Sequence, residues 1–210
     1  MAPPRPEDLI PTQRARRERI VDKAFEFLMH HEYEDIQVRD IADHAEVALG
    51  TLYRYFTSKE HLFAAVLVKW GDALRVRVQR APLQRGDVAG QLTEVYLRAI
   101  DAFERRPQFF RMLAVIESTA DPHARELWSE FSRITSQAFR EPLNALEPEQ
   151  AEAITNTLLP VLNGVLRAWV NGELAIDTAR TRMTDAIDLI FSPPPKPRRA
   201  RSAAPRAVTD

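Results

Sequence analysis

Apolar residues recur every three to four positions along most of the chain, which is the spacing of one face of an α-helix. The period-two alternation of a half-buried strand is nearly absent, and glycine supplies only 6 of the 210 residues. We therefore expect an all-α fold of about nine helices. Eight of them are expected to begin at Gln13, Val38, Leu49, Lys59, Asp87, Pro107, Pro122 and Pro148, and the ninth is expected near Asp177.

Prolines and short polar side chains indicate where these helices begin and end. Thr12, Ser58 and Asp177 are the expected N-caps of three of them, because their side-chain oxygens can accept from free backbone N–H groups. Pro82 and Gly86 are expected to end the long helix that begins at residue 59.

The same pattern divides the chain into four segments. Residues 1–11 are rich in proline and are expected to form a disordered arm. Residues 12–57 read as a three-helix domain, and residues 58–191 as a larger helical domain. Residues 192–210 read as a disordered basic tail, for which a solvated role is favoured over nonspecific attraction to DNA.

Residues 38–59 read as two short helices joined by a tight turn and followed by the start of a third helix. The first helix is expected over residues 38–45, the turn over 46–48 and the second helix over 49–56. Two helices crossed over a turn of about three residues form the helix-turn-helix, whose second helix enters the major groove of DNA.

The second of these helices carries residue types that suit DNA. Leu52 and Phe56 are expected to face inward, which leaves Thr51, Tyr53, Arg54 and Tyr55 directed outward or sideways. Gly50 lets the helix N-terminus approach a phosphate, and Arg54 and Lys59 supply cations. Arg39 is the candidate base contact. The expected DNA-binding residues are Arg39, Ala48, Leu49, Gly50, Thr51, Tyr53, Arg54, Tyr55 and Lys59.

The helix that precedes this stretch carries four arginines in its first turns, namely Arg14, Arg16, Arg17 and Arg19. They read equally well as a solvated charged face and as phosphate contacts beside the helix-turn-helix.

Three runs of this sequence resemble the TetR family of transcriptional regulators: residues 38–42 (VRDIA), residues 50–56 (GTLYRYF) and residues 58–60 (SKE). The resemblance covers roughly residues 12–70. The second run is also similar to that of actinobacterial members that govern steroid and lipid catabolism, although this chain has Leu49 where those members have valine. The resemblance implies a cytoplasmic homodimer that binds an inverted-repeat operator, and a repressor that a small effector releases.

Composition excludes several other classes of protein. The formal net charge is −1, so any contact with DNA must come from a local patch. Cysteine is absent, which fits a reducing cytosol and excludes disulfides and thiol nucleophiles. The histidines form no metal-binding motif, and no catalytic or nucleotide-binding motif is found, so we expect no metal, no cofactor and no enzyme activity.

An apolar effector pocket is expected between the helices of the larger domain. The helix that begins at Pro107 is apolar almost all round, which is typical of a helix that is buried on several sides or lines a cavity. Asn163 is the one polar candidate, since its neighbours are apolar. The expected lining residues are Phe103, Phe110, Leu113, Trp128, Phe131, Leu162 and Asn163. A mostly apolar lining implies an apolar or amphipathic ligand.

A dimer interface is expected on the last two helices, because their apolar arcs are wider than a single-sided environment requires. Gly164 and Ala168, four positions apart, would let two backbones approach closely. The expected interface residues are Ile154, Leu158, Val161, Val165, Trp169, Met183, Ile187 and Ile190.

The sequence therefore predicts a ligand-responsive transcriptional regulator that binds double-stranded DNA. Two alternatives remain. A dimeric DNA-binding protein without a sensor would have a fully packed second domain. A helical enzyme or adaptor would need a chemical centre, and the sequence offers none.

Overall fold

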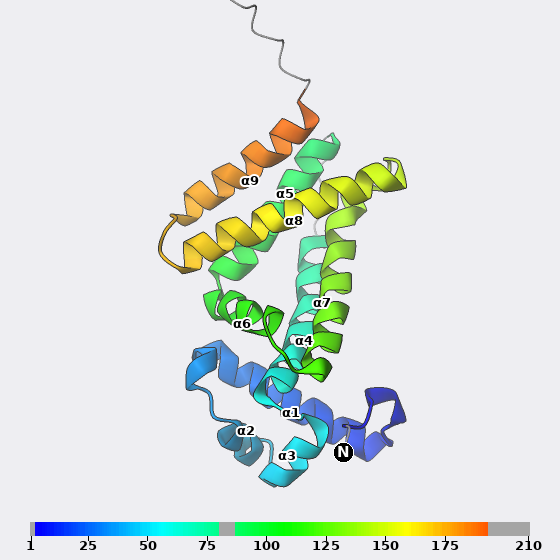
Figure 1. Ribbon diagram of the computed structural model, residues 1–210, viewed down its shortest axis with the longest axis vertical. Coiled ribbons are helices and arrows are strands. Elements are labelled where there is room, and N and C mark those ends of the chain that lie inside the picture. Colours follow the sequence, from blue (N-terminus) through cyan, green and yellow to red (C-terminus); the bar gives the residue numbers. More distant parts are fainter. Residues whose placement is uncertain (1–2, 80–86, 193–210) are drawn as a thin grey trace, which may run out of the picture.

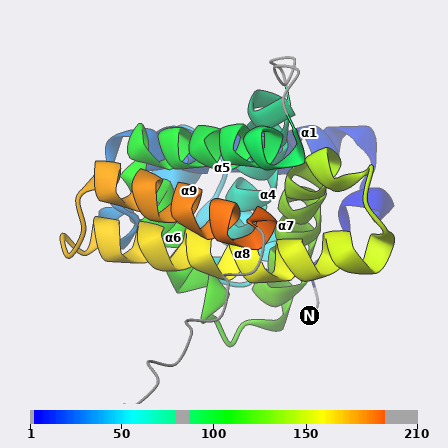
Figure 2. The same ribbon diagram turned by 90° about the horizontal axis from the view of Figure 1, so that it is seen from above.

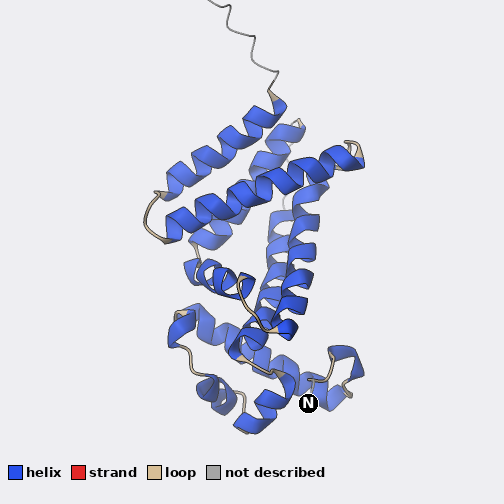
Figure 3. Cartoon of the chain, viewed as in Figure 1, coloured by secondary structure: helices blue, strands red, loops and turns tan. Residues whose placement is uncertain are grey.

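The computed structural model of the chain describes residues 3–79 and 87–192, and within these ranges every regular element is helical (Figure 3). The prediction of an all-α fold is confirmed. Nine α-helices are found in the described ranges: α1 (Pro11–His30), α2 (Val38–His44), α3 (Leu49–Tyr55), α4 (Lys59–Gln79), α5 (Val88–Glu104), α6 (Pro107–Glu117), α7 (Pro122–Arg140), α8 (Pro148–Val170) and α9 (Ile176–Phe191). Three short 3-10 helices accompany them: η1 (Pro6–Asp8), η2 (Tyr33–Asp35) and η3 (Glu141–Leu143).

Helices α1, α2 and α3 form a small unit at one end of the molecule, and the first turns of α4 close it (Figure 1). Its core is built from side chains that recur at helical spacing on each element. The fully buried members are Ile20, Ala24, Leu28, Ile41, Leu52, Phe56 and Phe63.

The larger part of the molecule is organised around α4 and α7, which run side by side over most of their length (Figure 1). Gly71 permits this close approach, because a Cβ atom at that position would lie 2.8 Å from Cδ2 of Phe131 on α7. Seen from above, α5, α8 and α9 form a layer over the ends of this pair (Figure 2). The α6 helix lies between that layer and α1 (Figure 1).

Aromatic side chains from four helices meet around Trp70 of α4. The Trp70 ring lies 4.8 Å from the Phe103 ring and 5.2 Å from the Phe109 ring, and Phe131 approaches from α7. Offset aromatic pairs at these distances add to the free energy gained from burying their area. This cluster therefore ties α4, α5, α6 and α7 into one core.

Two of the three expected N-caps are wrong. Ser58 accepts a hydrogen bond from the backbone N–H of His61 at 2.9 Å, as an N-cap should. Thr12, however, lies inside α1, which already begins at Pro11, and Asp177 lies inside α9, whose N-cap is Ala175. Proline is favoured as the first residue of a helix, because its ring fixes φ near the helical value. Helix α1 therefore begins at Pro11, two residues before the expected Gln13.

The expected disordered arm over residues 1–11 is wrong from residue 6 onward. Residues 6–8 form η1, and Leu9 is buried against the core. The Arg14 guanidinium donates to the Leu9 carbonyl, which holds the segment against α1. Pro82 and Gly86, and the tail from residue 193, lie outside the described residues.

Candidate DNA-binding site and effector cavity

The turn between α2 and α3 is fixed by backbone hydrogen bonds. The Val47 N–H reaches back to the Ala42 carbonyl at 3.0 Å, and Glu46 adopts a left-handed conformation with φ of 54°. This is the hydrogen-bonded ending that commonly stops a helix. Arg19 of α1 donates to the Ala45 carbonyl at 2.8 Å, so the end of α2 is also tied to the first helix.

This turn leaves one face of α3 open to solvent. Tyr53 keeps 46% of its surface exposed, and Arg54 beside it is also exposed. A Cβ atom at Gly50 would meet no atom within 4 Å, so the space in front of the α3 N-terminus is free. Arg39 and Ala48 are exposed as well, while Leu49 and Thr51 are half-buried. These seven of the nine predicted DNA-binding residues are therefore at least partly accessible to solvent.

Tyr55 does not belong to that surface. Its side chain is 2% exposed, and its hydroxyl is buried without a hydrogen-bond partner among the described residues. The expected outward direction is wrong because Tyr55 follows Leu52 by three positions, and residues three apart share a helix face.

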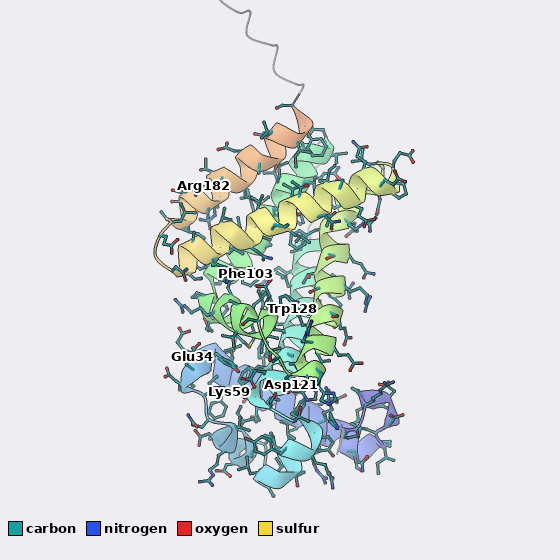
Figure 4. The ribbon with its side chains drawn as sticks, viewed as in Figure 1. Glu34, Lys59, Phe103, Asp121, Trp128 and Arg182 are labelled. Carbon is teal, nitrogen blue, oxygen red and sulfur yellow. The ribbon has the colours of Figure 1, made fainter. Side chains whose placement is uncertain are left out.

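Lys59 is also directed toward the protein. Its ammonium donates to the Tyr33 carbonyl and lies 4.3 Å from the centre of the Tyr33 ring. Burial lowers the pKa of Lys59, although Glu34 acts in the opposite direction. Figure 4 shows Lys59 beside Glu34, at the junction of the two parts. The expected role of Lys59 as a phosphate contact is therefore not supported by its position.

Three of the four arginines of α1 are occupied within the protein. Arg14 and Arg19 donate to backbone carbonyls, and the guanidinium of Arg17 lies 4.9 Å from the centre of the Phe56 ring. Burial lowers the pKa of Arg17. The described contacts thus give these arginines a structural role beside α2 and α3.

A polar cluster joins the helix-turn-helix to the N-terminus of α7. Asp121 accepts from the Ser58 hydroxyl and, at 3.2 Å, from the Thr57 hydroxyl, and it also caps α7 through the His123 N–H. Burial alone would raise the pKa of Asp121, but these hydrogen bonds hold it below its ordinary value. Asp121 lies at the boundary between the two parts (Figure 4).

His61 is buried in the same cluster. Its Nδ1 accepts from the Thr57 N–H at 3.2 Å, and its ring stacks on that of His123 at 5.4 Å. Burial lowers the pKa of His61 to about 4; Asp121 raises it, while His123 and Arg17 lower it further. His61 is therefore neutral at pH 7.

A cavity of about 100 Å³, here called the inner cavity, lies between α4, α5, α6, α7 and α8. Its lining residues are Leu74, Phe103, Leu113, Trp128, Phe131, Ser132, Thr135, Ser136, Phe139, Leu159, Leu162 and Asn163. Six of the seven predicted lining residues are among them, and Figure 4 shows Phe103 and Trp128 in the middle of the larger part.

The seventh predicted lining residue, Phe110, is not among the residues that line the inner cavity. It packs behind the wall, with its ring edge-on to Phe103 at 5.3 Å. The polar part of the wall was missed, namely Ser132, Thr135 and Ser136 on α7. These residues interrupt an apolar stripe at helical spacing, which is a signal that the sequence carries.

The predicted dimer interface is largely occupied inside the single chain. Leu158, Met183 and Ile187 are 0% exposed, because α9 packs on α5 as well as on α8. Ile154 and Val165 are also buried, whereas Val161, Trp169 and Ile190 are half-buried. Leu189 of α9, which was not predicted, is 76% exposed. Five of the eight predicted interface residues are therefore buried within the single chain, and three are half-buried.

Two further findings concern other kinds of site. Within residues 3–79 and 87–192, no group of three or more metal-ligating side chains is found. No helix in that part of the chain has the length and apolar character to cross a membrane.

A three-helix core that presents the second helix of a tight helix-turn-helix to solvent defines a class of DNA-binding proteins. The sequence profile of the bacterial regulatory proteins of the tetR family matches residues 20–66. A crystal structure of a TetR transcriptional regulator from Rhodococcus sp. RHA1 is 30% identical and superposes with a TM-score of 0.74, covering 86% of this chain and 97% of that one. The chain therefore belongs to the TetR family, whose members are transcriptional regulators and not enzymes.

Two curated relatives are both named HTH-type transcriptional repressor KstR. The protein from Mycolicibacterium smegmatis is 27% identical over 187 residues, with 89% of this chain and 92% of that protein covered. The protein from Rhodococcus jostii is 29% identical over 185 residues, with 85% and 84% covered. The similarity thus extends beyond the helix-turn-helix into the larger part of the chain.

Proposed function

We propose that this regulator is a repressor that binds an inverted-repeat operator as a homodimer and is released by a small apolar or amphipathic effector. The observation that carries the proposal is the position of Leu74, which belongs to both α4 and the wall of the inner cavity. Helix α4 begins shortly after α3, so an occupant of the cavity touches the helix that follows the DNA-binding helix in the chain. The names of both relatives favour repression over activation.

The proposed mechanism is a shift between two arrangements of α4. An effector that fits the cavity better in one arrangement favours that arrangement, and the spacing of the two α3 helices in a dimer changes with it. Asp121 strengthens this coupling in the proposal, because α7 supplies half of the residues that line the cavity and is bonded through Asp121 to Thr57 and Ser58.

The effector is proposed to be lipid-derived or steroid-derived, including CoA thioesters, on the similarity of residues 50–56 to regulators of such catabolism. The hydroxyl groups of Ser132, Thr135 and Ser136 and the amide of Asn163 would orient such a ligand by a few hydrogen bonds. Ligand pockets usually measure about 300–1,000 Å³. The inner cavity is smaller, so binding requires wall side chains such as Trp128 and Leu159 to move.

That small volume also favours the second candidate function, a DNA-binding protein that senses no small molecule. Both candidates place the protein with the chromosome in the cytoplasm, and they differ in their response to ligands. The discriminating experiment starts with selection of bound DNA from a random pool by the purified full chain. We expect an inverted repeat whose half-sites lie about one helical turn, or a multiple of it, apart.

Binding to the selected operator is then measured in the presence of a panel of lipid-derived and steroid-derived compounds. Loss of operator binding with one compound class, together with a thermal shift of the protein, supports the effector-responsive repressor. If an operator is found but no compound of the panel changes binding to it, the result favours the protein without a sensor. Failure to enrich any sequence would contradict both.

A further inference from the structure

A second hollow of about 860 Å³, here called the outer groove, lies between α1, α4 and α5. Its lining residues are Phe25, Met29, Trp70, Asp72, Ala73, Leu74, Val76, Arg77, Ala102, Arg105 and Arg106. Leu74 lines both hollows, and it is the one lining residue that they share. The outer groove is far larger than the inner cavity, and its other lining residues are different.

The floor of the outer groove is apolar and partly open to solvent. Phe25 and Met29 come from α1, and Trp70, Leu74 and Val76 come from α4. Val76 is 37% exposed, so part of this apolar floor is open to solvent. Exposed apolar surface that is rimmed by polar residues typically marks a binding site.

The rim of the groove carries an excess of positive charge. Arg77, Arg105 and Arg106 contribute three cations, while the one acidic lining residue, Asp72, is already paired with Arg75 at 3.5 Å. Within the described part of the chain, the side chains of Arg77 and Arg105 make no ion pair or hydrogen bond.

The carboxylates nearest in sequence to this rim are engaged elsewhere. Asp101 and Glu104 of α5 both accept from Arg180 of α9, Asp101 at 2.9 Å and Glu104 at 2.5 Å. Neither carboxylate forms an ion pair with Arg105 within the described part of the chain. An apolar floor beneath unpaired guanidinium groups is complementary to a molecule with an apolar body and an anionic head.

We propose that the outer groove binds an amphipathic anion, with its apolar body on Phe25, Met29 and Val76 and its carboxylate or phosphate head at Arg77 and Arg105. This site is distinct from the inner cavity and goes beyond the proposed effector site. Because Phe25 and Met29 belong to α1, the bound molecule bridges the DNA-binding unit and the larger part.

The test is calorimetric titration of the full chain with dodecanoate, with dodecyl phosphate as the second head group and dodecanol as the neutral control. The informative variant is the double substitution Arg77→Gln with Arg105→Gln, since both side chains are exposed. We expect it to weaken dodecanoate binding by about tenfold or more, as loss of two solvent-exposed charge contacts would. Dodecanol should bind weakly and equally to both proteins.

Two further variants make the result specific. Arg182→Gln removes an exposed arginine of α9 (labelled in Figure 4) that does not line the outer groove, and it should leave dodecanoate binding unchanged. Ser132→Leu fills the inner cavity and should also leave it unchanged. Dodecanoate binding that survives the double substitution, or that Ser132→Leu abolishes, would overturn the assignment. Equal affinities for dodecanoate and dodecanol, or no binding at all, would overturn it too. A preference between carboxylate and phosphate identifies the head group.

Discussion

At the scale of single residues, Tyr53 and Arg39 are the side chains through which the DNA-binding surface is expected to read sequence. Tyr53→Ala and Arg39→Ala should each weaken operator binding without a change in thermal unfolding, because both side chains are exposed. A lost bidentate contact of Arg39 with guanine would cost about 1–3 kcal/mol of binding free energy. Operator titration by fluorescence anisotropy measures the effect, with Arg182→Ala as the remote control. If both variants bind the operator with wild-type affinity, the surface that contacts the bases lies elsewhere.

His61 predicts how stability depends on pH. Its pKa is about 4 in the folded chain and near 6.5 when unfolded, so below pH 6.5 the unfolded state binds more protons. Stability should therefore fall as pH falls from about 6.5 to about 4, by up to about 1.4 kcal/mol per pH unit. Urea unfolding at a series of pH values measures this slope.

His61→Gln removes the titrating group and should flatten the profile in that window. His30→Gln, at an exposed histidine of α1, should leave the slope unchanged. The carboxyl group of Asp121 titrates below this window, because its pKa lies under the ordinary value, so its contribution is lost only at lower pH. A wild-type slope in the His61 variant would contradict the assignment.

Several of the predictions that the structure does not support concern single residues. Helical spacing indicated correctly that Leu52 and Phe56 face inward, but Tyr55, three positions after Leu52, was wrongly assigned to the outward side. Lys59 looked like a free cation because its partner is the carbonyl of Tyr33, 26 residues away. A backbone carbonyl leaves no signal in the sequence, so this contact could not be predicted.

At the scale of elements, the contact between α4 and α7 connects the inner cavity to the DNA-binding unit. Gly71→Ala should bring a methyl group to within about 3 Å of the Phe131 ring, which forms part of the cavity wall. Overpacking of this kind typically costs 1–3 kcal/mol, against at most about 1 kcal/mol gained from the better helix propensity of alanine. We expect net destabilisation, measured by urea unfolding.

The matched control is Gly50→Ala on α3, where an added Cβ atom meets nothing within 4 Å. Relief of the conformational entropy of glycine should make that variant more stable, by roughly 0.5 kcal/mol or more. The same methyl group stands in front of the α3 N-terminus and should weaken operator binding. Equal stability changes in the two variants would show that the contact of Gly71 with Phe131 is not tight.

The helices were predicted well because the 3.6-residue period of apolar positions can be seen within each short segment of the sequence. Prolines at 107, 122 and 148 gave the starts of α6, α7 and α8 correctly. The helix on which each apolar face packs cannot be predicted from that segment alone. Met183 and Ile187 looked uncovered at the end of the chain, but α9 packs on α5, to which Arg180 ties it through Asp101 at 2.9 Å. The sequence therefore indicated which faces are apolar, but not that α9 packs on α5 within the same chain.

At the scale of the whole molecule, the remaining question is how two copies would pair. The outward face of α8 and α9 offers Val161, half-buried, with Gly164 and Ala168 for close backbone approach and Leu189 standing into solvent. We expect two copies of this face to pack about a two-fold axis, with the same surface on both subunits. Such symmetry places the two α3 helices so that they match an inverted repeat.

A charge placed on that face tests the pairing without unfolding the monomer. Gly164→Glu and Leu189→Glu are suitable because both positions are exposed in a single chain, whereas a charge at Val165 or Ile187 would enter the core. A carboxylate buried without a partner should weaken the dimer by about 3 kcal/mol or more, roughly a hundredfold in its dissociation constant. Sedimentation at micromolar concentration should then show monomers, and operator binding should fall in parallel.

Ser129→Glu, at an exposed position of α7, is the matched control and should remain dimeric. The test bears on function because sedimentation and operator binding are measured on the same variants. Each half of an inverted repeat holds one α3 helix, so a monomer keeps the contacts of one half-site and loses those of the other. Wild-type protein that sediments as a monomer, or variants that stay dimeric, would contradict this interface. Variants that become monomeric yet bind the operator like wild type would contradict the two-fold arrangement on DNA.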